Sequence, residues 1–222
     1  MQGYDLRVKS IIFKNSYEKN LEDIDVKIKT VDGILDYFKT GVVVQEWLKI
    51  ILAYGNYLNG TSNRGGAYGF KLDNINKLGD IKSNDNKKTL LSFIVEGVMD
   101  GDNKDILEVN QVDPNNSIAL VSEMSRELTK SFASVVKLND LSKNITDTND
   151  KTTEFLGNFY EKCNTKINKQ NNDIKSLETK YESLANFYGE NPKDCSYDQF
   201  IEIFNKFFKD VSVRFYIIKY TY

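Results

Sequence analysis

Apolar residues recur three or four positions apart along most of this chain, which is the spacing of amphipathic α-helices. The first such run covers residues 6–20, and a second covers residues 21–39. A more apolar run, residues 42–52, follows Gly41, and we expect this glycine to break the helix before it. The pattern therefore predicts three helices that contribute to the core, with Trp47 among the buried side chains.

Two longer helices are predicted in the second half of the chain. The first begins after residues 113–117 and ends near Ile145, and a polar loop, residues 144–150, leads to the second at residues 152–188. From Cys163 onward the second helix shows the heptad spacing of a coiled coil. Its seam positions are Cys163, Ile167, Gln170, Ile174, Leu177, Tyr181, Leu184 and Tyr188. At a rise of about 1.5 Å per residue this helix would be roughly 55 Å long, which indicates an elongated rod.

Signals for a further helix follow the rod. Gly189 is a natural C-cap, and residues 196–199 (Ser-Tyr-Asp-Gln) form a capping box that opens the last helix. The apolar face of this helix carries Phe200, Ile203, Phe204, Phe207, Phe208 and Val211. The predicted fold class is all-α, an elongated helical bundle with long antiparallel coiled-coil helices and a smaller helical subdomain.

Glycine and asparagine are concentrated in residues 53–95, which lead from one apolar helix to the next. Seven of the 13 glycines fall between Gly41 and Gly79. A backbone needs glycine where φ is positive or where another group passes close by. Because the rest of the chain has the pattern of plain amphipathic helix, the unusual shape requirement lies in this loop.

Composition narrows the chemistry that the chain can perform. There is no histidine, which removes Ser–His and Cys–His nucleophile pairs and histidine-ligated metal sites. The two cysteines, Cys163 and Cys195, are far apart, so they cannot form a four-cysteine zinc site, and they fit a reducing cytosol. We therefore predict no catalytic residues, no metal site and no cofactor, and we expect the protein not to be an enzyme.

Charge and hydropathy argue against nucleic acid and membranes as partners of this chain. The formal net charge of −2 gives no bulk field toward nucleic acid or anionic lipid. No apolar run approaches the roughly eighteen residues needed to span a bilayer, and the N-terminus lacks the pattern of a signal peptide. The glycines of residues 65–69 lack the Gly-Lys-Ser/Thr ending of a phosphate-binding loop. We expect a cytoplasmic protein with no nucleic-acid partner and no membrane insertion.

Four short motifs in the glycine-rich region carry a resemblance to a known family. They are Gly-Asn-Tyr-Leu-Asn at 55–59, Gly-Phe-Lys-Leu at 69–72, Lys-Leu-Gly-Asp-Ile-Lys-Ser at 77–83 and Thr-Leu-Leu-Ser-Phe-Ile at 89–94. In order and spacing they closely resemble the signature of the formin homology 2 domain, the actin-assembly domain of formins. Residues 7–14 resemble a pattern that lies upstream of this signature in the family.

The resemblance implies one partial domain over residues 1–222, corresponding to about the C-terminal half of the family's domain. Its parts are N-terminal coiled-coil helices at about 1–40, a post with the signature loop at 41–116, long helices with a Phe-rich return helix at 117–212, and a divergent tail at 213–222. The family's N-terminal lasso, its linker and most of its knob precede this region and are expected to be absent from the 222 residues.

In the family, the lasso of one subunit wraps the post of the other, and two such grips close a homodimeric ring around actin. The implied lasso-binding pocket comprises Gly55, Asn56, Tyr57, Asn59, Gly65, Gly69 and Phe70, with Tyr57, Tyr68 and Phe70 expected to form its walls. Glycines there would let a bulky aromatic side chain sit close to the backbone. The alternative from the residues alone is that these glycines only allow a tight turn between helices. Without a lasso, the 222 residues are expected to be monomeric and poor at nucleation, because such a ring cannot close.

Three lysines are the implied actin contacts. Lys82 matches the lysine that contacts actin in the family, and Lys77 and Lys71 flank it as weaker candidates. The implied function is actin filament nucleation and processive elongation at the barbed end, in the cytoplasm and the cytoskeleton. The alternative from composition alone is a helical coiled-coil scaffold or interaction protein without actin activity.

Overall fold

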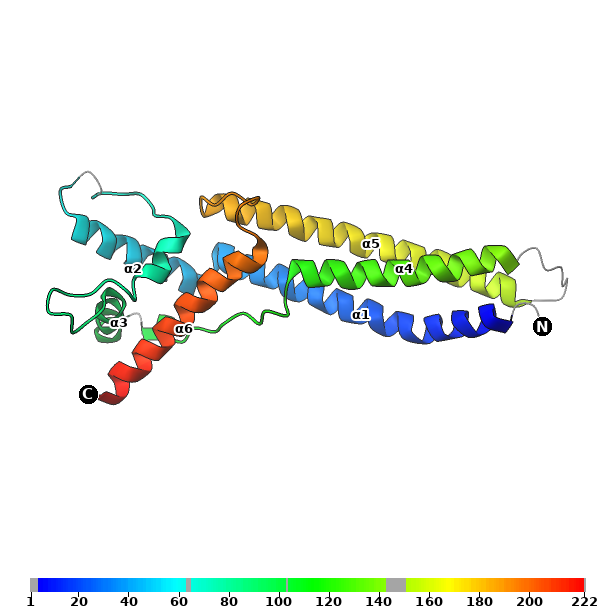
Figure 1. The fold of residues 1–222 in the computed structure, drawn as a ribbon, viewed down its shortest axis with the longest axis horizontal. Helices are drawn as coiled ribbons and strands as arrows, with labels where there is room; N and C mark the ends of the chain where they lie inside the picture. Colours follow the sequence, from blue (N-terminus) through cyan, green and yellow to red (C-terminus); the bar gives the residue numbers. More distant parts are fainter. Residues whose placement is uncertain (1–3, 63–64, 103, 143–150, 222) are drawn as a thin grey trace. The chain divides into compact units, whose positions relative to one another are not determined.

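A computed structural model describes residues 4–62, 65–102, 104–142 and 151–221 (Figure 1). Its elements, in chain order, are α1 (Tyr4–Thr40), α2 (Val42–Asn59), η1 (Leu72–Lys77), α3 (Leu90–Asp100), η2 (Lys104–Leu107), α4 (Ile118–Ser142), α5 (Lys151–Phe187) and α6 (Tyr197–Thr221). All are helices, and the described residues contain no strand. The all-α prediction is therefore confirmed. The predicted polar loop at 144–150 lies outside the described residues.

The chain divides into two compact units, and each is described by itself. Unit 1 comprises Met1–Asp32 and Asn115–Thr179, and unit 2 comprises Gly33–Pro114 and Lys180–Tyr222. Unit 1 contains most of α1, α4 and α5. Unit 2 contains the glycine-rich region, the two 3₁₀-helices and α6, and therefore contains every predicted site residue.

The N-terminal region forms one helix where the sequence pattern predicts two. α1 is continuous across the expected boundary between residues 20 and 21. The buried positions Phe13, Tyr17, Leu21 and Ile24 keep steps of four, four and three through this point, and no glycine or proline interrupts them. With an unbroken apolar stripe and no breaker, the helix has no reason to end there. It ends where predicted, at Gly41, whose N–H bonds Tyr37 O at 2.8 Å.

Unit 1 is a three-helix coiled coil, and its polar contacts give the direction of α1 and α5. Ser10 on α1 bonds the hydroxyl of Tyr160 on α5 at 2.8 Å. Further along both helices, the side-chain amide of Gln170 donates to Asp25 Oδ1 at 2.7 Å and to Leu21 O at 2.9 Å. In these contacting pairs the residue number increases along both helices in the same direction, so α1 and α5 are parallel. Gln170 is 2% exposed, and a bonded polar group at a seam position fixes the register of the two helices.

α4 runs antiparallel to both of its neighbours in unit 1. Ser125 near its start donates to Asn171 Oδ1 on α5 at 2.9 Å, whereas Phe132 further along contacts the earlier Tyr160, with ring centroids 6.2 Å apart. Phe132 also lies 6.0 Å from Phe13 of α1. The predicted seam residues from Cys163 to Leu177 are buried in unit 1, where Gln170 bonds α1, whereas the last seam residues, Tyr181 and Tyr188, pack on Phe200 of α6 in unit 2.

Aromatic side chains form the core of unit 2. Phe38 at the end of α1 packs on Phe204 of α6 with centroids 4.7 Å apart, and Trp47 of α2 meets Phe207 edge-on at 5.4 Å. Trp47 is 1% exposed, as the sequence predicts, and its indole N–H donates to Ile106 O at 2.8 Å. These contacts tie α1, α2, η2 and α6 into one core.

Both predicted signals around α6 are confirmed. Gly189 has φ of 73°, and the N–H of Glu190 bonds Ala185 O at 2.9 Å, which is the bonding pattern of a helix C-cap. Ser196 and Gln199 bond each other's backbone N–H groups at 3.3 and 2.8 Å, which is a capping box. α6 then continues as a helix through the predicted divergent tail to Thr221.

Removing a ring from the aromatic core tests how much unit 2 depends on it. Phe204→Ala is expected to lower the free energy of unfolding by about 3–5 kcal/mol, because it leaves a cavity between α1 and α6. The single tryptophan, Trp47, lies in this core, so its fluorescence in a urea titration reports on unit 2. Phe187→Ala, at a 63% exposed phenylalanine, is the matched control and should change the value by less than about 0.5 kcal/mol. Equal effects of the two changes would contradict this account of the core.

Candidate functional site

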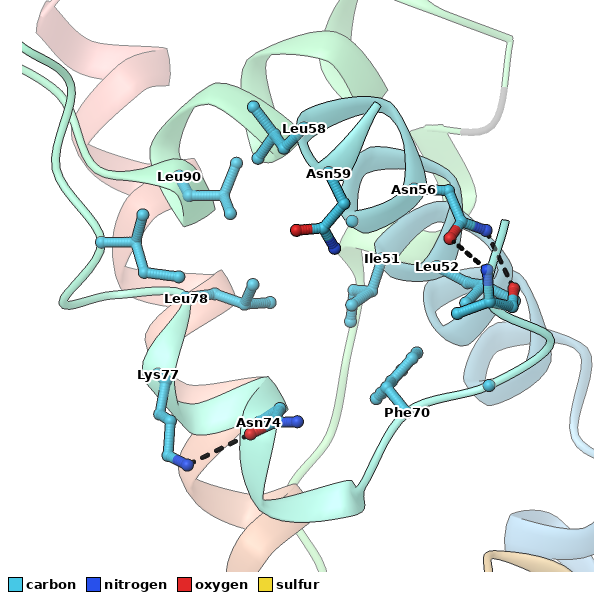
Figure 2. A pocket seen from close by; sticks show the side chains of 14 residues that line it. Ile51, Leu52, Asn56, Leu58, Asn59, Phe70, Asn74, Lys77, Leu78 and Leu90 are labelled. Carbon is cyan, nitrogen blue, oxygen red and sulfur yellow. Dashed lines mark hydrogen bonds between the residues drawn. The ribbon is translucent and has the colours of Figure 1, made fainter. Parts of the chain in front are cut away.

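The signature loop is held against the end of α2 by one asparagine. The side chain of Asn56 donates to Ala67 O at 2.9 Å and accepts from Ala67 N at 2.8 Å, so both of its polar atoms bond the same backbone position (Figure 2). α2 itself ends at Gly60, whose φ is 52° and whose N–H bonds Asn56 O and Tyr57 O. The loop therefore leaves the helix sharply and returns alongside it.

A pocket of about 420 Å³ lies between α2, this loop, η1 and the start of α3 (Figure 2). Its lining residues are Ile51, Leu52, Gly55, Asn56, Leu58, Asn59, Ala67, Gly69, Phe70, Asn74, Lys77, Leu78, Ile81 and Leu90. Aliphatic and aromatic side chains make up eight of these fourteen residues, and three asparagine amides and one lysine supply the polar groups. The lining is the kind that accepts an apolar side chain while bonding a backbone beside it.

The structure brings together five of the seven predicted pocket residues. Gly55, Asn56, Asn59, Gly69 and Phe70 all line the pocket. They come from α2 and from the returning loop, and the two Asn56 bonds hold these segments side by side. The remaining two predicted residues lie elsewhere.

Tyr57 does not line the pocket and is 84% exposed. It follows Gly55 by two positions, and residues two apart on a helix face different sides. Tyr68 is fully exposed and also lies outside the lining, so of the three aromatic walls expected from sequence only Phe70 takes part.

Gly65 also lies outside the lining, and the backbone itself requires a glycine there. A Cβ at this position would lie 1.8 Å from Gly60 O, far inside any real contact distance. The N–H of Gly65 bonds Ser62 O at 2.9 Å, so this position closes the first turn of the loop. At Gly65 the alternative of a glycine required only for a tight turn therefore has direct geometric support.

Gly55 shows the opposite situation. It lies inside α2 with an ordinary helical backbone, and a Cβ there would meet no described atom within 4 Å. Glycine in a helix interior is less stable than alanine by roughly 0.5–1 kcal/mol. The local fold would therefore accept a side chain at this position, and without one the pocket reaches the helix backbone.

Sequence reasoning missed several of the apolar lining residues. Ile51 and Leu58 lie four before and three after Gly55, so helical spacing from that glycine could have found them. Leu78, Ile81 and Leu90 come from other segments, and only the tertiary structure brings them to the pocket.

The three predicted lysines occupy different places. Lys77 lines the pocket, and its Nζ bonds Asn74 Oδ1 at 3.1 Å (Figure 2). Lys82 lines a neighbouring pocket of about 370 Å³, which shares Leu58, Ile81 and Leu90 with the first. Lys71 is exposed and lines neither of them.

Lys82 is displayed on a short hairpin-like turn that is stabilised from within. Lys82 pairs with Thr89 in an isolated antiparallel bridge, and Ser83 N bonds Lys88 O at 2.9 Å. Inside the turn, the Ser83 hydroxyl donates to the carboxylate of Asp85, and this bond holds the pKa of Asp85 below its ordinary value. The turn gives Lys82 an ordered base from which its chain extends into solvent.

The two thiols are not available as nucleophiles. Cys163 is fully buried, and burial raises the pKa of its thiol to about 11. Cys195 is 8% exposed, and burial raises its pKa as well. Thiolate, the reactive form, is therefore suppressed at both positions near neutral pH. The described residues also include no cluster of three or more His, Cys, Asp or Glu side chains placed to hold a metal ion.

Comparison with known families gives a match over almost the entire chain. The family model described as the Formin Homology 2 Domain matches residues 1–212. The chain belongs to the formin homology 2 family. The match includes α1 to α5 and most of α6, and it ends where the sequence predicts a divergent tail.

Individual formins show the same relationship. Formin-H of Dictyostelium discoideum is 31% identical over 221 residues, which cover 93% of this chain and 20% of that protein. Protein diaphanous homolog 3 of Mus musculus is 28% identical over 209 residues, covering 90% of this chain and 18% of its own length. Formin-like protein 3 of Homo sapiens is 28% identical over 209 residues, which cover 91% of this chain and 19% of that protein. The chain thus spans about a fifth of the length of these formins.

Among the residues that the structure describes, no helix of this formin homology 2 chain combines the length and the apolar character needed to cross a bilayer.

The contrast between the two glycines gives a test by substitution. Gly65→Ala is expected to destabilise the loop, and with it unit 2, by roughly 1–3 kcal/mol, because the added methyl group forces backbone atoms apart. Gly55→Ala should instead raise the free energy of unfolding by about 0.5–1 kcal/mol. Trp47 fluorescence during a urea titration measures the free energy of unfolding of both variants, and hydrogen exchange at the Ala67 amide reports on the stability of the loop directly. A loss of stability with Gly55→Ala would show that the fold needs this glycine.

Proposed function

We propose that these residues form the post and coiled-coil portion of a formin's actin-assembly domain, which takes part in filament nucleation and processive elongation at the barbed end. The observation that carries the proposal is the pocket at Gly55. Most of its lining residues belong to the four signature motifs, more than half of them are apolar, and on one side the helix α2 lacks the side chain that the fold would accept.

The proposed occupant of this pocket is an extended lasso segment of a second subunit with an aromatic side chain as anchor. An aromatic ring buries a large apolar area and has few rotamers to lose, which makes it an effective anchor at interfaces. Asn59 and Asn74 point their amides toward the pocket (Figure 2), where they can bond the backbone of such a segment. In this arrangement Gly55 and Gly69 let the partner approach the backbone closely.

A scaffold without actin activity is the competing proposal, and two observations disfavour it. A coiled-coil scaffold would be expected to offer an open heptad seam, but in unit 1 the seam residues from Cys163 to Leu177 are buried within the chain itself. A passive helix would also gain stability from alanine at Gly55, where the chain instead has glycine. A pocket that receives a partner accounts for the glycine at this position.

Lys82 is the proposed main contact to actin, with Lys77 and Lys71 as secondary contacts. All three are exposed, and Lys82 lies on an ordered turn beside an apolar pocket, so its charge can meet an acidic surface at a partly desolvated contact. We place the activity in the cytoplasm, at the cytoskeleton. We propose that a polypeptide of just these 222 residues is monomeric, because it offers a receiving pocket but no lasso segment to fill the pocket of a second copy.

A side chain at Gly55 is expected to block dimer formation in a complete formin homology 2 domain. Gly55→Val adds a branched group where the lasso is proposed to lie, and valine is no worse than glycine as a helix former. Sedimentation should show a shift from dimer to monomer, with a dimer dissociation constant at least tenfold higher, while circular dichroism shows unchanged helicity. Gly33→Val is the matched control, because Gly33 is also a helical glycine with no described atom near its Cβ. A dimer as stable as the unmodified one would refute the pocket assignment.

Reversing the charge at Lys82 is expected to weaken actin assembly at least tenfold in a complete domain, since the change both removes an attractive pair and places a carboxylate against an acidic surface. Assembly rates of pyrene-labelled actin measure this. Lys104→Asp, at another exposed lysine of unit 2, is the matched control and should leave the rates unchanged. If the Lys82→Asp variant forms a normal dimer and assembles actin at the normal rate, Lys82 is not part of the actin contact. If the unmodified domain assembles no actin, the result favours the scaffold without actin activity.

A further inference from the structure

The C-terminal turns of α6, drawn in red in Figure 1, have an exposed apolar face. Its side chains are Val213, Tyr216, Ile217 and Tyr220, which are 46%, 61%, 49% and 73% exposed. They are spaced three, one and three residues apart, so they lie on one side of the helix, here called the outer face. All four lie beyond the family match, which ends at residue 212.

The fold does not need the outer face, because α6 is anchored through its other side. Val211 is fully buried, and Phe215 and Ile218, which follow it at helical spacing, are partly buried. Phe215 borders a pocket together with Met99 of α3 and Leu107 of η2. The last turns are therefore held against unit 2 while the outer face remains in solvent.

Positive charge is concentrated on the C-terminal part of α6, although the whole chain carries a net charge of −2; the segment at η2 that borders Phe215 and Lys219 adds Lys104, Asp105 and Glu108. Residues 203–222 contain four cationic side chains, Lys206, Lys209, Arg214 and Lys219, and one carboxylate, that of Asp210. Lys206 and Lys209 are exposed one to two turns before Val213.

Cationic and aromatic groups are interleaved at the end of the helix. Lys219 Nζ lies 5.4 Å from the ring centroid of Phe215 and 5.8 Å from that of Tyr220. The rings of Tyr216 and Tyr220 stack with centroids 5.8 Å apart. Aromatic rings that have a polar tip, placed beside cations with long apolar stems, suit a boundary between water and an apolar phase.

We propose that the outer face of α6 binds the surface of a membrane containing anionic lipids. The helix lies in the plane of the interface, with Val213 and Ile217 among the acyl chains and the tyrosine hydroxyls at the level of the headgroups. Arg214 and Lys219, with Lys206 and Lys209, meet the negative charge of the lipids, and each cation contributes on the order of fivefold to partitioning. The proposal is independent of the actin function, because it uses residues outside the signature loop.

Charge and side-chain type favour lipid over other occupants. A second copy of the helix would bring the same four cations together, so their mutual repulsion opposes a symmetric pair. Nucleic acid would use the cations and the aromatic rings, but it offers no partner for the aliphatic Val213 and Ile217. An anionic bilayer uses both parts of the surface.

Co-sedimentation with vesicles tests the proposal on the intact chain. Binding is expected to vesicles of phosphatidylcholine mixed with phosphatidylserine, and at least tenfold less to vesicles of phosphatidylcholine alone. The double variant Arg214→Gln, Lys219→Gln should reduce binding on the order of tenfold or more. The variant Tyr216→Ser, Ile217→Ser should also reduce it at least tenfold while circular dichroism shows unchanged helicity, because the apolar part is lost with all cations in place.

Matched controls lie on exposed positions of unit 1. Lys162→Gln with Lys169→Gln removes two exposed cations of α5, and Ile12→Ser with Val26→Ser removes two exposed apolar groups of α1. Both controls should bind like the unmodified chain. Equal binding to the two vesicle types, unchanged binding of Tyr216→Ser, Ile217→Ser, or an equal loss in the controls would overturn the proposal. Competition by polyglutamate would also overturn it if polyglutamate displaces the vesicles and binds the variant Tyr216→Ser, Ile217→Ser as tightly as the unmodified chain. That result would assign the outer face to acidic proteins.

Discussion

The packing of Trp47 into the aromatic core of unit 2 is the constraint on which the candidate site depends. Its ring meets Phe207, and its indole N–H bonds Ile106 O, so the rotation of α2 about its axis is fixed. Trp47 and Ile51 lie buried on one face of α2, and the half-buried Gly55 follows at the same spacing of four, where this face borders the pocket. At Gly55 the side chain is missing, and the pocket is the continuation of a core face from which one side chain has been omitted.

Two kinds of glycine make this possible, and they differ in what their surroundings require. Gly65 is demanded by the backbone, because Gly60 O occupies the place of its Cβ. Gly55 is not demanded by the fold and reduces helix stability, and the proposed lasso in the pocket would account for its use. Asn56 connects the two regions. Its two bonds to the backbone of Ala67 hold the loop that contains Gly65 against the end of α2, the helix that contains Gly55.

α6 contributes to the core through one side and carries the proposed membrane contact on the other. Its inner side supplies Phe204 and Phe207 to the core, and the same side continues to Val211 and Phe215. Because that anchoring uses only one side, the outer side is free to vary in chemistry. It changes from charged to apolar at Val213, where the family match has ended.

The sequence alone determined the helical class, the buried heptad positions of α5, both caps around α6 and the family, because these follow from local spacing and short motifs. Five of the seven residues that the resemblance assigned to a lasso pocket also line a pocket of the structure. It predicted a break in α1 where the buried stripe runs on without one. The tertiary structure decided which residues meet across segments. Leu78, Ile81 and Leu90 reach the pocket only through the path of the chain after the loop, and Tyr57 is turned away by the rotation that Trp47 imposes. Periodicity states which residues share a face, but only packing against distant segments decides what that face meets.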